Sequence, residues 1–380
     1  MAIAVHLAAA MTIDLSTLGL LGRSQIIHRL IAAGLPIDVR LPSEKKTVRR
    51  SISGVDVRVA LPITFTPFVS VNPCSARCRF CSETLVHRDA TTLSAALRPG
   101  RHYFDDLGRA LLALGDLPLG LSLSGLEATD DAPFLRRLLA CFDEHVVAGG
   151  VIRERVLYSN ANGLTREKDG QALIAYLARF GIDRVEISRH HPQQAAIAAI
   201  MRFFPQSPAG QQAAFEQAVR DASSQLNVRL VCVVQRGGVE DRAGVEAYLS
   251  WAEGLGISDV VFRELARLGD DYRQNEPLRY VAKHRVGIES LLGEILDDDH
   301  ASGRGPGEFT SEALTAGYYY WSLRLRWRER MTVSFETSDY GEMKARHRSD
   351  CVYKLIFHAN GNLCADWDPN TRVLLAGTKS

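Results

Sequence analysis

Six short runs of β-branched and aliphatic residues alternate with longer segments of helical periodicity between residues 60 and 266. These runs predict strands at Thr64 to Val71, Gly120 to Ser124, Arg153 to Ser159, Asp183 to Ser188, Asn227 to Gln235 and Asp259 to Glu264. The intervening helices are expected at Phe104 to Leu114, Pro133 to Val147, Gln171 to Phe180, Gln211 to Leu226 and Ala243 to Leu255. Strands that alternate with helices pair in parallel through right-handed crossovers, so the sequence predicts an α/β fold.

Two architectures satisfy this alternation, an open doubly wound sheet and a partial barrel. Periodicity alone does not choose between them. In both architectures the chemistry lies at the carboxyl ends of the strands, so the residues that follow each predicted strand are the first candidates for a site.

The chain changes character after residue 266. A long helix is expected at Glu276 to Leu296, and the aromatic and basic stretch from Tyr318 to Arg328 could stack a base, grip a phosphate or form an amphipathic helix. A hairpin is expected from Tyr353 to Trp367, turned at Asn360-Gly361. These changes divide the chain into residues 1–60 (helix and connection, with a basic, polar stretch from Ser43 to Arg50), 61–266 (core) and 267–380 (extension).

Composition narrows the range of partners. The 380 residues include 45 Lys and Arg against 44 Asp and Glu, so there is no charge excess for nucleic acid or for an anionic membrane. No apolar run reaches the ~18 residues needed to span a bilayer. Met1 to Leu21 is apolar but lacks a positive start and contains Asp14, so we expect translation to begin at Met11 rather than a signal peptide. The expected location is the cytoplasm.

Three of the seven cysteines, Cys74, Cys78 and Cys81, fall within eight residues directly after the first predicted strand. Thiolates at C-x3-C-x2-C spacing in one loop can wrap a [4Fe-4S] cluster, bind three of its irons and leave the fourth open to a ligand. The alternative is a structural zinc site that adds His87. Zinc motifs usually pair C-x2-C knuckles with a distant second pair, so the spacing favours the iron–sulfur cluster.

This loop, with Phe80 just before the third cysteine, resembles that of the radical S-adenosylmethionine (SAM) superfamily. The resemblance implies that the methionyl amine and carboxylate of SAM occupy the open iron. It also implies that one electron from the cluster cleaves SAM to methionine and a 5′-deoxyadenosyl radical, which abstracts a hydrogen atom from a substrate. The protein would supply orientation and exclusion of water.

The resemblance extends in order along the later strand ends. Ser124-Gly125-Leu126-Glu127-Ala128 is similar to a relaxed Gly-Gly-Glu-Pro motif, and Ser159-Asn160-Ala161-Asn162-Gly163 is similar to the Thr-Asn-Gly turn of many members. An ordinary strand-ending turn explains the second segment equally well. The SAM-binding residues that the resemblance implies are Phe80, Gly125, Glu127, Ser159, Asn160, Asn162, Ser188, Arg189 and Val233.

The segment after residue 226 looks like the corresponding stretch of the branch that contains the GTP cyclase of molybdenum-cofactor synthesis. Candidate substrate residues are His190, Arg263 and Glu264, and the last two could instead form a salt-bridged pair that caps the fold. The resemblance covers residues 60 to 266. It implies a six-stranded partial (β/α)6 TIM-like barrel with a smaller C-terminal α+β extension, in which Val231 and Val233 face inward and shield the radical.

Two of the other cysteines, Cys351 and Cys364, resemble a degenerate form of the segment that holds an auxiliary cluster in that branch. Arg348 stands where a further cysteine is expected, so a hairpin that has lost its cluster is the simpler interpretation. Cys141 and Cys232 are expected to be small core residues.

The function implied by the resemblance is hydrogen-atom abstraction from a small-molecule substrate, in cofactor or specialised-metabolite biosynthesis. The expected cofactors are a [4Fe-4S] cluster and SAM, and the expected electron donor is a flavodoxin or ferredoxin. Three alternatives stay open: a peptide-modifying radical SAM maturase with an auxiliary cluster, a radical SAM relative that binds the cluster without productive chemistry, and a zinc-binding α/β protein without catalysis.

Overall fold

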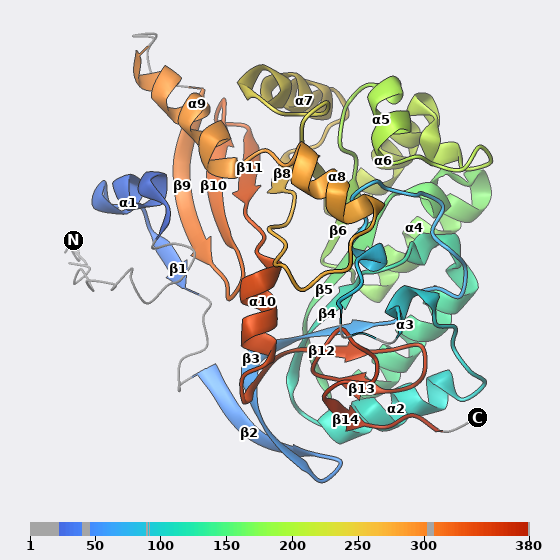
Figure 1. The fold of residues 1–380 in the computed structure, drawn as a ribbon. Coiled ribbons are helices and arrows are strands. Elements are labelled where there is room, and N and C mark those ends of the chain that lie inside the picture. Colours follow the sequence, from blue (N-terminus) through green and yellow to red (C-terminus); the bar gives the residue numbers. More distant parts are fainter. Residues whose placement is uncertain (1–22, 40–45, 89, 91, 302–307, 379–380) are drawn as a thin grey trace, which may run out of the picture.

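The computed structural model describes residues 23–39, 46–88, 90, 92–301 and 308–378 (Figure 1). The Met11 start and the apolar N-terminal stretch lie outside these residues. Within these ranges fourteen strands form one open sheet with the order β1-β9-β10-β11-β8-β7-β6-β5-β4-β3-β12-β13-β14, and β2 pairs with β3 off this path. No helix in the described ranges is long and apolar enough to cross a membrane.

The centre of the sheet is made of the six predicted strands, which lie side by side in chain order and are all parallel. They are β3 (Val55–Pro67), β4 (Pro118–Leu123), β5 (Val151–Ser159), β6 (Arg184–Ser188), β7 (Val228–Val234) and β8 (Asp259–Glu264). Only β3 begins much earlier than predicted. Its first half forms an antiparallel hairpin with β2 (Thr47–Ile52), so a strand covers part of the expected polar connection.

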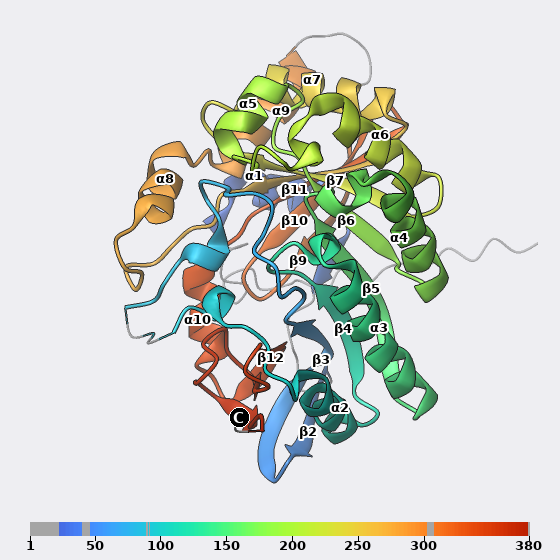
Figure 2. The ribbon, with the colours of Figure 1, turned by 90° about the vertical axis from the view of Figure 1, so that its right-hand side faces the viewer.

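Helices cover one face of this central sheet (Figure 2). Their apolar stripes form a single core with alternate residues of the strands, such as Leu121, Ile187, Leu230 and Phe262. The helices are α2 (Tyr103–Leu114), α3 (Ala132–Val147), α4 (Glu167–Phe180), α6 (Gln212–Ser223), α7 (Arg242–Gly254) and α9 (Ile288–Ala301). A doubly wound sheet buries both faces under helices, so this one-sided covering contradicts that architecture.

Successive residues of a strand point to opposite faces of the sheet. Since the apolar residues of the six strands face the helices, the other face carries mostly polar side chains. Ser122, Tyr158, Glu186, Arg229 and Arg263 all lie on it, outside the helix-packed core. This face is therefore the place where a polar ligand could be bound.

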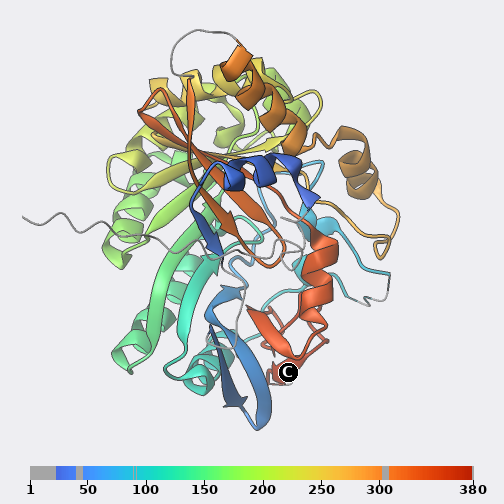
Figure 3. The same ribbon diagram turned by 90° about the vertical axis from the view of Figure 1, so that its left-hand side faces the viewer.

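The described part of the chain contributes fourteen strands to the sheet, so the prediction of six accounts only for its centre. On one side β11 (Met331–Glu336) pairs in parallel with β8 and continues through β10 (Trp321–Trp327), β9 (Phe309–Ala316) and β1 (Ile37–Val39). On the other side β12 (Cys351–Phe357) pairs in parallel with β3 and continues through β13 (Leu363–Cys364) and β14 (Val373–Leu375). Figure 3 shows β9–β11 beside α1 (Gln25–Ala32).

The long helix expected at Glu276 to Leu296 is wrong. Two helices form instead, α8 (Glu276–His284) and α9, because Arg285 adopts an extended backbone. Arg285 forms a β-bridge with Gln235, and its guanidinium lies 2.7 Å from the carboxylate of Glu264. A tertiary ion pair thus interrupts a segment whose local periodicity is helical.

The aromatic and basic stretch forms no helix: its centre is strand β10. Trp321, Leu323, Leu325 and Trp327 are all buried at a spacing of two residues, which is the period of a strand. The expected C-terminal hairpin is confirmed by the antiparallel pairing of β12 with β13, with Gly361 in the left-handed region at its turn.

Candidate functional site

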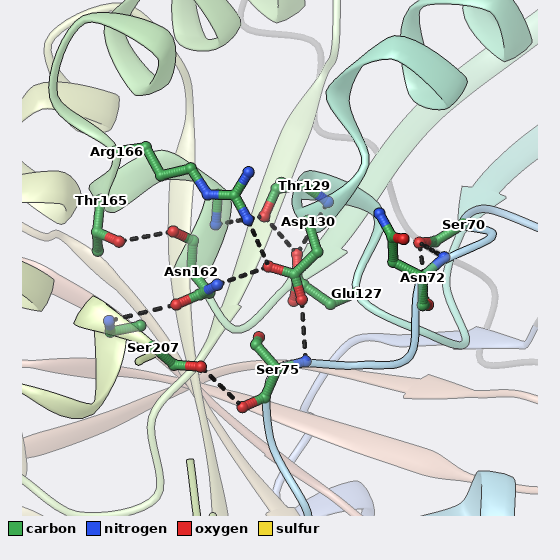
Figure 4. A network of polar contacts seen from close by, with 12 residues as sticks. Ser70, Asn72, Ser75, Glu127, Thr129, Asp130, Asn162, Thr165, Arg166 and Ser207 are labelled. Carbon is green, nitrogen blue, oxygen red and sulfur yellow. Dashed lines mark hydrogen bonds and ion pairs between the residues drawn. The ribbon is translucent and has the colours of Figure 1, made fainter. Parts of the chain in front are cut away.

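The loop that carries the three cysteines follows β3 at its carboxyl end and is held by contacts from distant segments. Asp130 accepts the backbone N–H of Ser75 at 2.9 Å (Figure 4). The backbone N–H of Arg79 donates to the carbonyl of Ile200 at the end of α5 (Gln194–Ile200). Side chains of α5 also pack against Cys78 and Phe80. Contacts from distant segments therefore help to set the conformation of the loop.

The three thiols lie close enough to influence one another. Burial raises the pKa of Cys78 well above its ordinary value, and Cys81 and Cys74 raise it further. Burial, followed by Glu127, raises the pKa of Cys74 to about 12, and burial followed by Glu83 raises that of Cys81 to about 11. A cationic group must bind to hold these side chains as thiolates.

The zinc alternative gains no support. Among the described residues, no three His, Cys, Asp or Glu side chains converge on a position for a single metal ion. His87 stacks on Tyr272 with ring centroids 4.2 Å apart, and its Nδ1 lies 3.0 Å from Nζ of Lys344. In a [4Fe-4S] cluster each thiolate binds a different iron, so three cysteines of one loop fit a cluster without converging on one point.

Glu127 is buried, and its carboxylate joins two strand ends. Its Oε1 accepts from the backbone and hydroxyl of Thr129 and from the hydroxyl of Ser159, at 2.6–3.1 Å. Its Oε2 accepts the backbone N–H of Asn160. Burial, and then Asp130, raises the pKa of Glu127 to about 7. Glu127 thus links the segments that follow β4 and β5, and both of its carboxylate oxygens already accept hydrogen bonds from the protein.

The polar turn after β5 reaches back to the cysteine loop. Nδ2 of Asn160 lies 3.6 Å from Sγ of Cys74 and 3.0 Å from Oγ of Ser75. Asn162 donates to Asp130 at 2.7 Å, in the network of Figure 4. Ser159 and Asn160 therefore contact Glu127, and Asn162 contacts Asp130. Gly125, two residues before Glu127, has a φ of 118°.

The structure separates Ser188 from Arg189. Ser188 lies on the polar face of the sheet, whereas Arg189 is fully buried on the helix side. The guanidinium of Arg189 donates to the carbonyl of Ala209 and to Gln212, and it stacks over the ring of Phe215 at 4.2 Å. Arg189 is thus part of the packing between sheet and helices and does not reach the cysteine loop.

His190 lies against the cysteine loop. Its ring is 5.0 Å from that of Phe80, edge to face, and its Nδ1 accepts the backbone N–H of Val233 at 3.0 Å. Burial, followed by Arg189 and Arg263, lowers the pKa of His190 to about 3. The ring is therefore neutral with its proton on Nε2, and that N–H has no hydrogen-bond partner in the described part of the chain.

Arg263 and Glu264 do not pair with each other, so that alternative is wrong. They occupy adjacent strand positions and point to opposite faces. Arg263 donates to Oε2 of Glu336 at 2.6 and 2.9 Å and lies 3.6 Å from Glu186. The carboxylate of Glu264 faces Arg285 and Arg267 and accepts the backbone N–H of Ile288.

Glu186 is the centre of an ionic network that the sequence did not single out. Its carboxylate lies within 3.6 Å of three arginines, Arg184, Arg229 and Arg263. The strand alternates polar and apolar residues, so the sequence did contain one signal, a carboxylate between the apolar residues Val185 and Ile187. This network forms part of the polar face below the strand ends.

Apart from Gly125, the residues that line a hollow beside the cysteine loop were missed by the sequence reasoning. The hollow measures about 360 Å³ with its open mouth included. Its walls include Thr66, Glu83, Gly125, His358 and Trp367. Two sequence signals marked the region: Glu83 stands two residues after a cysteine of the loop, and a lysine, Lys354, interrupts the apolar strand β12 beside it.

Cys351 and Cys364 are buried but are not brought together. Cys364 pairs with Ile356, which lies five residues after Cys351 on β12. At ~3.3 Å per residue, the two cysteines are roughly 16 Å apart, too far to bind one cubane. Cys232 lies in the apolar core, and Cys141 on α3 packs against this core.

Comparison with known proteins gives likeness in structure only. No family model and no curated protein matches the chain. The matching solved structures include anSMEcpe with bound AdoMet, at 12% identity, 64% of this chain, 62% of that chain and a TM-score of 0.42. Streptococcus suis SuiB bound to S-adenosylmethionine matches at 13% identity, 80% of this chain, 60% of that chain and a TM-score of 0.45.

A third structure, coproporphyrinogen III oxidase (HemN) from Escherichia coli, is described as a radical SAM enzyme. It matches at 11% identity, 69% of this chain, 66% of that chain and a TM-score of 0.38. The chain thus spans less than two thirds of the length of each of these three proteins. A likeness with TM-scores below 0.5 carries no weight for chemistry, which has to come from the chain's own residues.

Proposed function

We propose that this chain is a radical SAM enzyme whose cluster is held by Cys74, Cys78 and Cys81. The observation that carries the proposal is the cysteine loop itself. Three thiols lie in one loop at the carboxyl end of the first of six parallel strands, near enough that Cys81 and Cys74 raise the pKa of Cys78, and no fourth protein ligand converges on them among the described residues. That donor set fits a [4Fe-4S] cluster with one open iron.

When bound, such a group supplies the electron that cleaves SAM and gives a 5′-deoxyadenosyl radical. The chain's own residues do the rest. Glu127 and Asp130 fix the segments after β4 and β5 against the cysteine loop. Phe80 and His190 close the loop toward β7. The turn at Gly125 and the side chains of Asn160 and Ser188 are the residues we assign to SAM contact.

We assign the six central strands to a partial (β/α)6 barrel that spans residues 61–266. Residues 1–60 precede it, and residues 267–380 extend the sheet on both sides. The polar face of the strands is the substrate side, and Val231 and Val233 share it without belonging to the apolar core. A similarity to the GTP cyclase branch stays part of this proposal.

We further propose a small-molecule substrate, in cofactor or specialised-metabolite biosynthesis, and a flavodoxin- or ferredoxin-type electron donor in a reducing cytoplasm. An auxiliary cluster has no place in the proposal, because Cys351 and Cys364 lie too far apart to share one.

The test is anaerobic purification, reconstitution, and measurement of iron, zinc and SAM cleavage under dithionite. We expect about four irons per chain and formation of 5′-deoxyadenosine, with both lost in Cys78→Ala. Cys141→Ala is the matched control, since Cys141 lies on α3 away from the loop, and it should retain both. Zinc in place of iron, or iron without SAM cleavage, would overturn the proposal.

A further inference from the structure

Two arginines lie on the exposed side of the cysteine loop, which runs between α5 and α8 (Figure 2). Arg77 and Arg79 flank Cys78 in the sequence; Arg77 is exposed, and 40% of the side chain of Arg79 is exposed. The guanidinium of Arg77 lies 4.5 Å from the centre of the Phe204 ring, and that of Arg79 lies 4.7 Å from the centre of the Tyr280 ring. Stacking on a ring fixes the position of each charge and leaves N–H donors at the guanidinium edge.

The neighbouring segments add three more cations. Arg202 follows α5, and 45% of its side chain is exposed. Arg279 and Lys283 are exposed on α8, and they follow Glu276 at helical spacing on one stripe of that helix. Glu276 lies 3.3 Å from Arg202 and 3.9 Å from Arg79. We call the five cations the basic patch: Arg77, Arg79, Arg202, Arg279 and Lys283.

The charge of the basic patch is local. The whole chain has 45 Lys and Arg against 44 Asp and Glu, so an excess at one place is balanced elsewhere. Asp271, which precedes α8, does not offset the patch, because its carboxylate lies 3.1 Å from Nζ of Lys344 and 3.8 Å from Arg348. The exposed side of the cysteine loop is therefore a region of positive potential.

Arg202 has a backbone conformation that favours glycine. Its φ of 53° lies in the left-handed region, which costs a residue with a Cβ roughly 1–2 kcal/mol. The carbonyls of Met201 and Arg202 accept the backbone N–H of Arg77 at 3.0 and 3.2 Å, so the cysteine loop holds this conformation. An exposed arginine thus stands where glycine would be less strained, which indicates that its side chain acts outside the fold.

We propose that the basic patch is the docking surface for an acidic electron-carrier protein of the flavodoxin or ferredoxin type. The inference rests on the proposed function, because that function needs an electron from outside the chain. The reduced carrier gives one electron to the oxidised cluster and leaves oxidised by one electron, and no bond forms or breaks. Electron transfer slows steeply with distance, so the carrier must lie over the loop that holds Cys78, where the patch attracts it.

A nucleic acid fits the basic patch less well. Proteins that bind single strands combine basic residues with open aromatic faces on which bases stack. In the patch, the guanidinium groups of Arg77 and Arg79 already cover the rings of Phe204 and Tyr280. The charges therefore surround the cysteine loop without offering a stacking surface.

The first measurement is calorimetric binding of oxidised flavodoxin, an acidic protein, to the reconstituted protein. The patch variant carries Arg77→Glu with Arg279→Glu. The control carries Arg49→Glu with Arg153→Glu, which changes the net charge equally at exposed positions on β2 and at the amino end of β5. The control should bind like the parent, and the patch variant about tenfold more weakly or worse. Binding to the parent should weaken between ~0.01 and ~1 M salt, as the screening length falls from about 30 to 3 Å.

The second measurement is the rate at which flavodoxin hydroquinone bleaches the visible absorption of the cluster. This rate should be at least about tenfold lower in the patch variant than in the parent and the control. Photoreduced deazaflavin, a small reductant that needs no docking surface, should reduce all three proteins equally fast. That result, with about four irons per chain in each protein, separates lost docking from a damaged cluster site.

The proposal is overturned if the patch variant binds flavodoxin and takes its electron as well as the control does. It is also overturned if deazaflavin reduces the patch variant as slowly as flavodoxin does, or if a single-stranded RNA binds the parent more tightly than flavodoxin and is lost in the patch variant. Flavodoxin binding at the patch without any SAM cleavage would contradict the proposed function alone. SAM cleavage under dithionite with equal flavodoxin binding in all three proteins would contradict this inference alone.

Discussion

The side-chain amide of Asn160 lies 3.6 Å from Sγ of Cys74, a residue 86 positions earlier in the chain. The same amide nitrogen lies 3.0 Å from Oγ of Ser75. The turn after β5 therefore contacts the cysteine loop directly. A donor beside a ligating sulfur orients the ligand and tunes the bound metal.

Asn160→Ala removes that donor. We expect the variant to lose iron at a chelator concentration about ten- to hundredfold lower than the unaltered protein, because residues that orient metal ligands contribute that much to affinity. Iron retention against increasing chelator measures it. Asn227→Ala, at an exposed position, is the control and should behave as the parent. Equal iron retention in all three proteins would show that the contact has no role in binding.

Glu127 makes stability depend on pH. Burial, and then Asp130, raises its pKa from 4.5 to about 7 in the folded state. The folded protein then binds more protons than the unfolded chain between these values, so its stabilising contribution is full below pH 4.5 and is lost as the pH rises to about 7. The loss is about 3 kcal/mol at 1.36 kcal/mol per unit.

Glu127→Gln cannot titrate, so the difference in unfolding free energy between parent and variant should narrow as pH rises from 4.5 to 7. Urea denaturation of both proteins at several pH values measures this difference. The contributions of all other titrating groups are the same in both proteins and cancel in the difference. The Glu127→Gln variant is expected to be less stable than the parent at every pH, because the amide NH2 of the glutamine would face the backbone N–H of Asn160, which is also a donor. A difference that stays constant across this window would refute the assignment.

Arg263 and Glu336 form an ion pair on the polar face, and Arg263 also faces Glu186. Arg263→Met should destabilise the fold by roughly 3 kcal/mol, because it removes the main cationic partner of Glu336 and leaves only the weaker contributions of Arg229 and Ser322. The double variant Arg263→Met with Glu336→Leu should recover part of that loss. Chemical denaturation of both variants measures the coupling. A double variant less stable than the single one would contradict this account, because it would mean that Arg229 and Ser322 stabilise Glu336 more than Arg263 does.

Cys351→Ala and Cys364→Ala should each leave the iron content of the reconstituted protein unchanged, since their separation on β12 and β13 prevents a shared cluster. Iron analysis beside Cys78→Ala gives the comparison. A fall from about eight irons per chain to about four in either variant would restore the auxiliary cluster.

The sequence determined the central strands well because each is a local pattern. The runs at Asp183 to Ser188 and Asp259 to Glu264 match β6 and β8 nearly to the residue. Strand β10 (Trp321–Trp327) was not predicted as a strand, although its buried residues alternate along the sequence. The basic residues between them suggested a helix with one charged face. The parallel pairs β8–β11 and β3–β12 join segments far apart in sequence, and no local signal reports them.

The cysteine loop and the turns after β4 and β5 could also be located from the sequence, because both depend on residue types at short spacing. The face of the sheet on which each side chain lies could not be read from the sequence. Alternation places Ser188 and Arg189, or Arg263 and Glu264, on opposite faces. Only the packing of the helices on one side of the sheet decided that Arg189 and Glu264 are structural, that Glu186 lies on the polar face and that Glu83 lines the hollow.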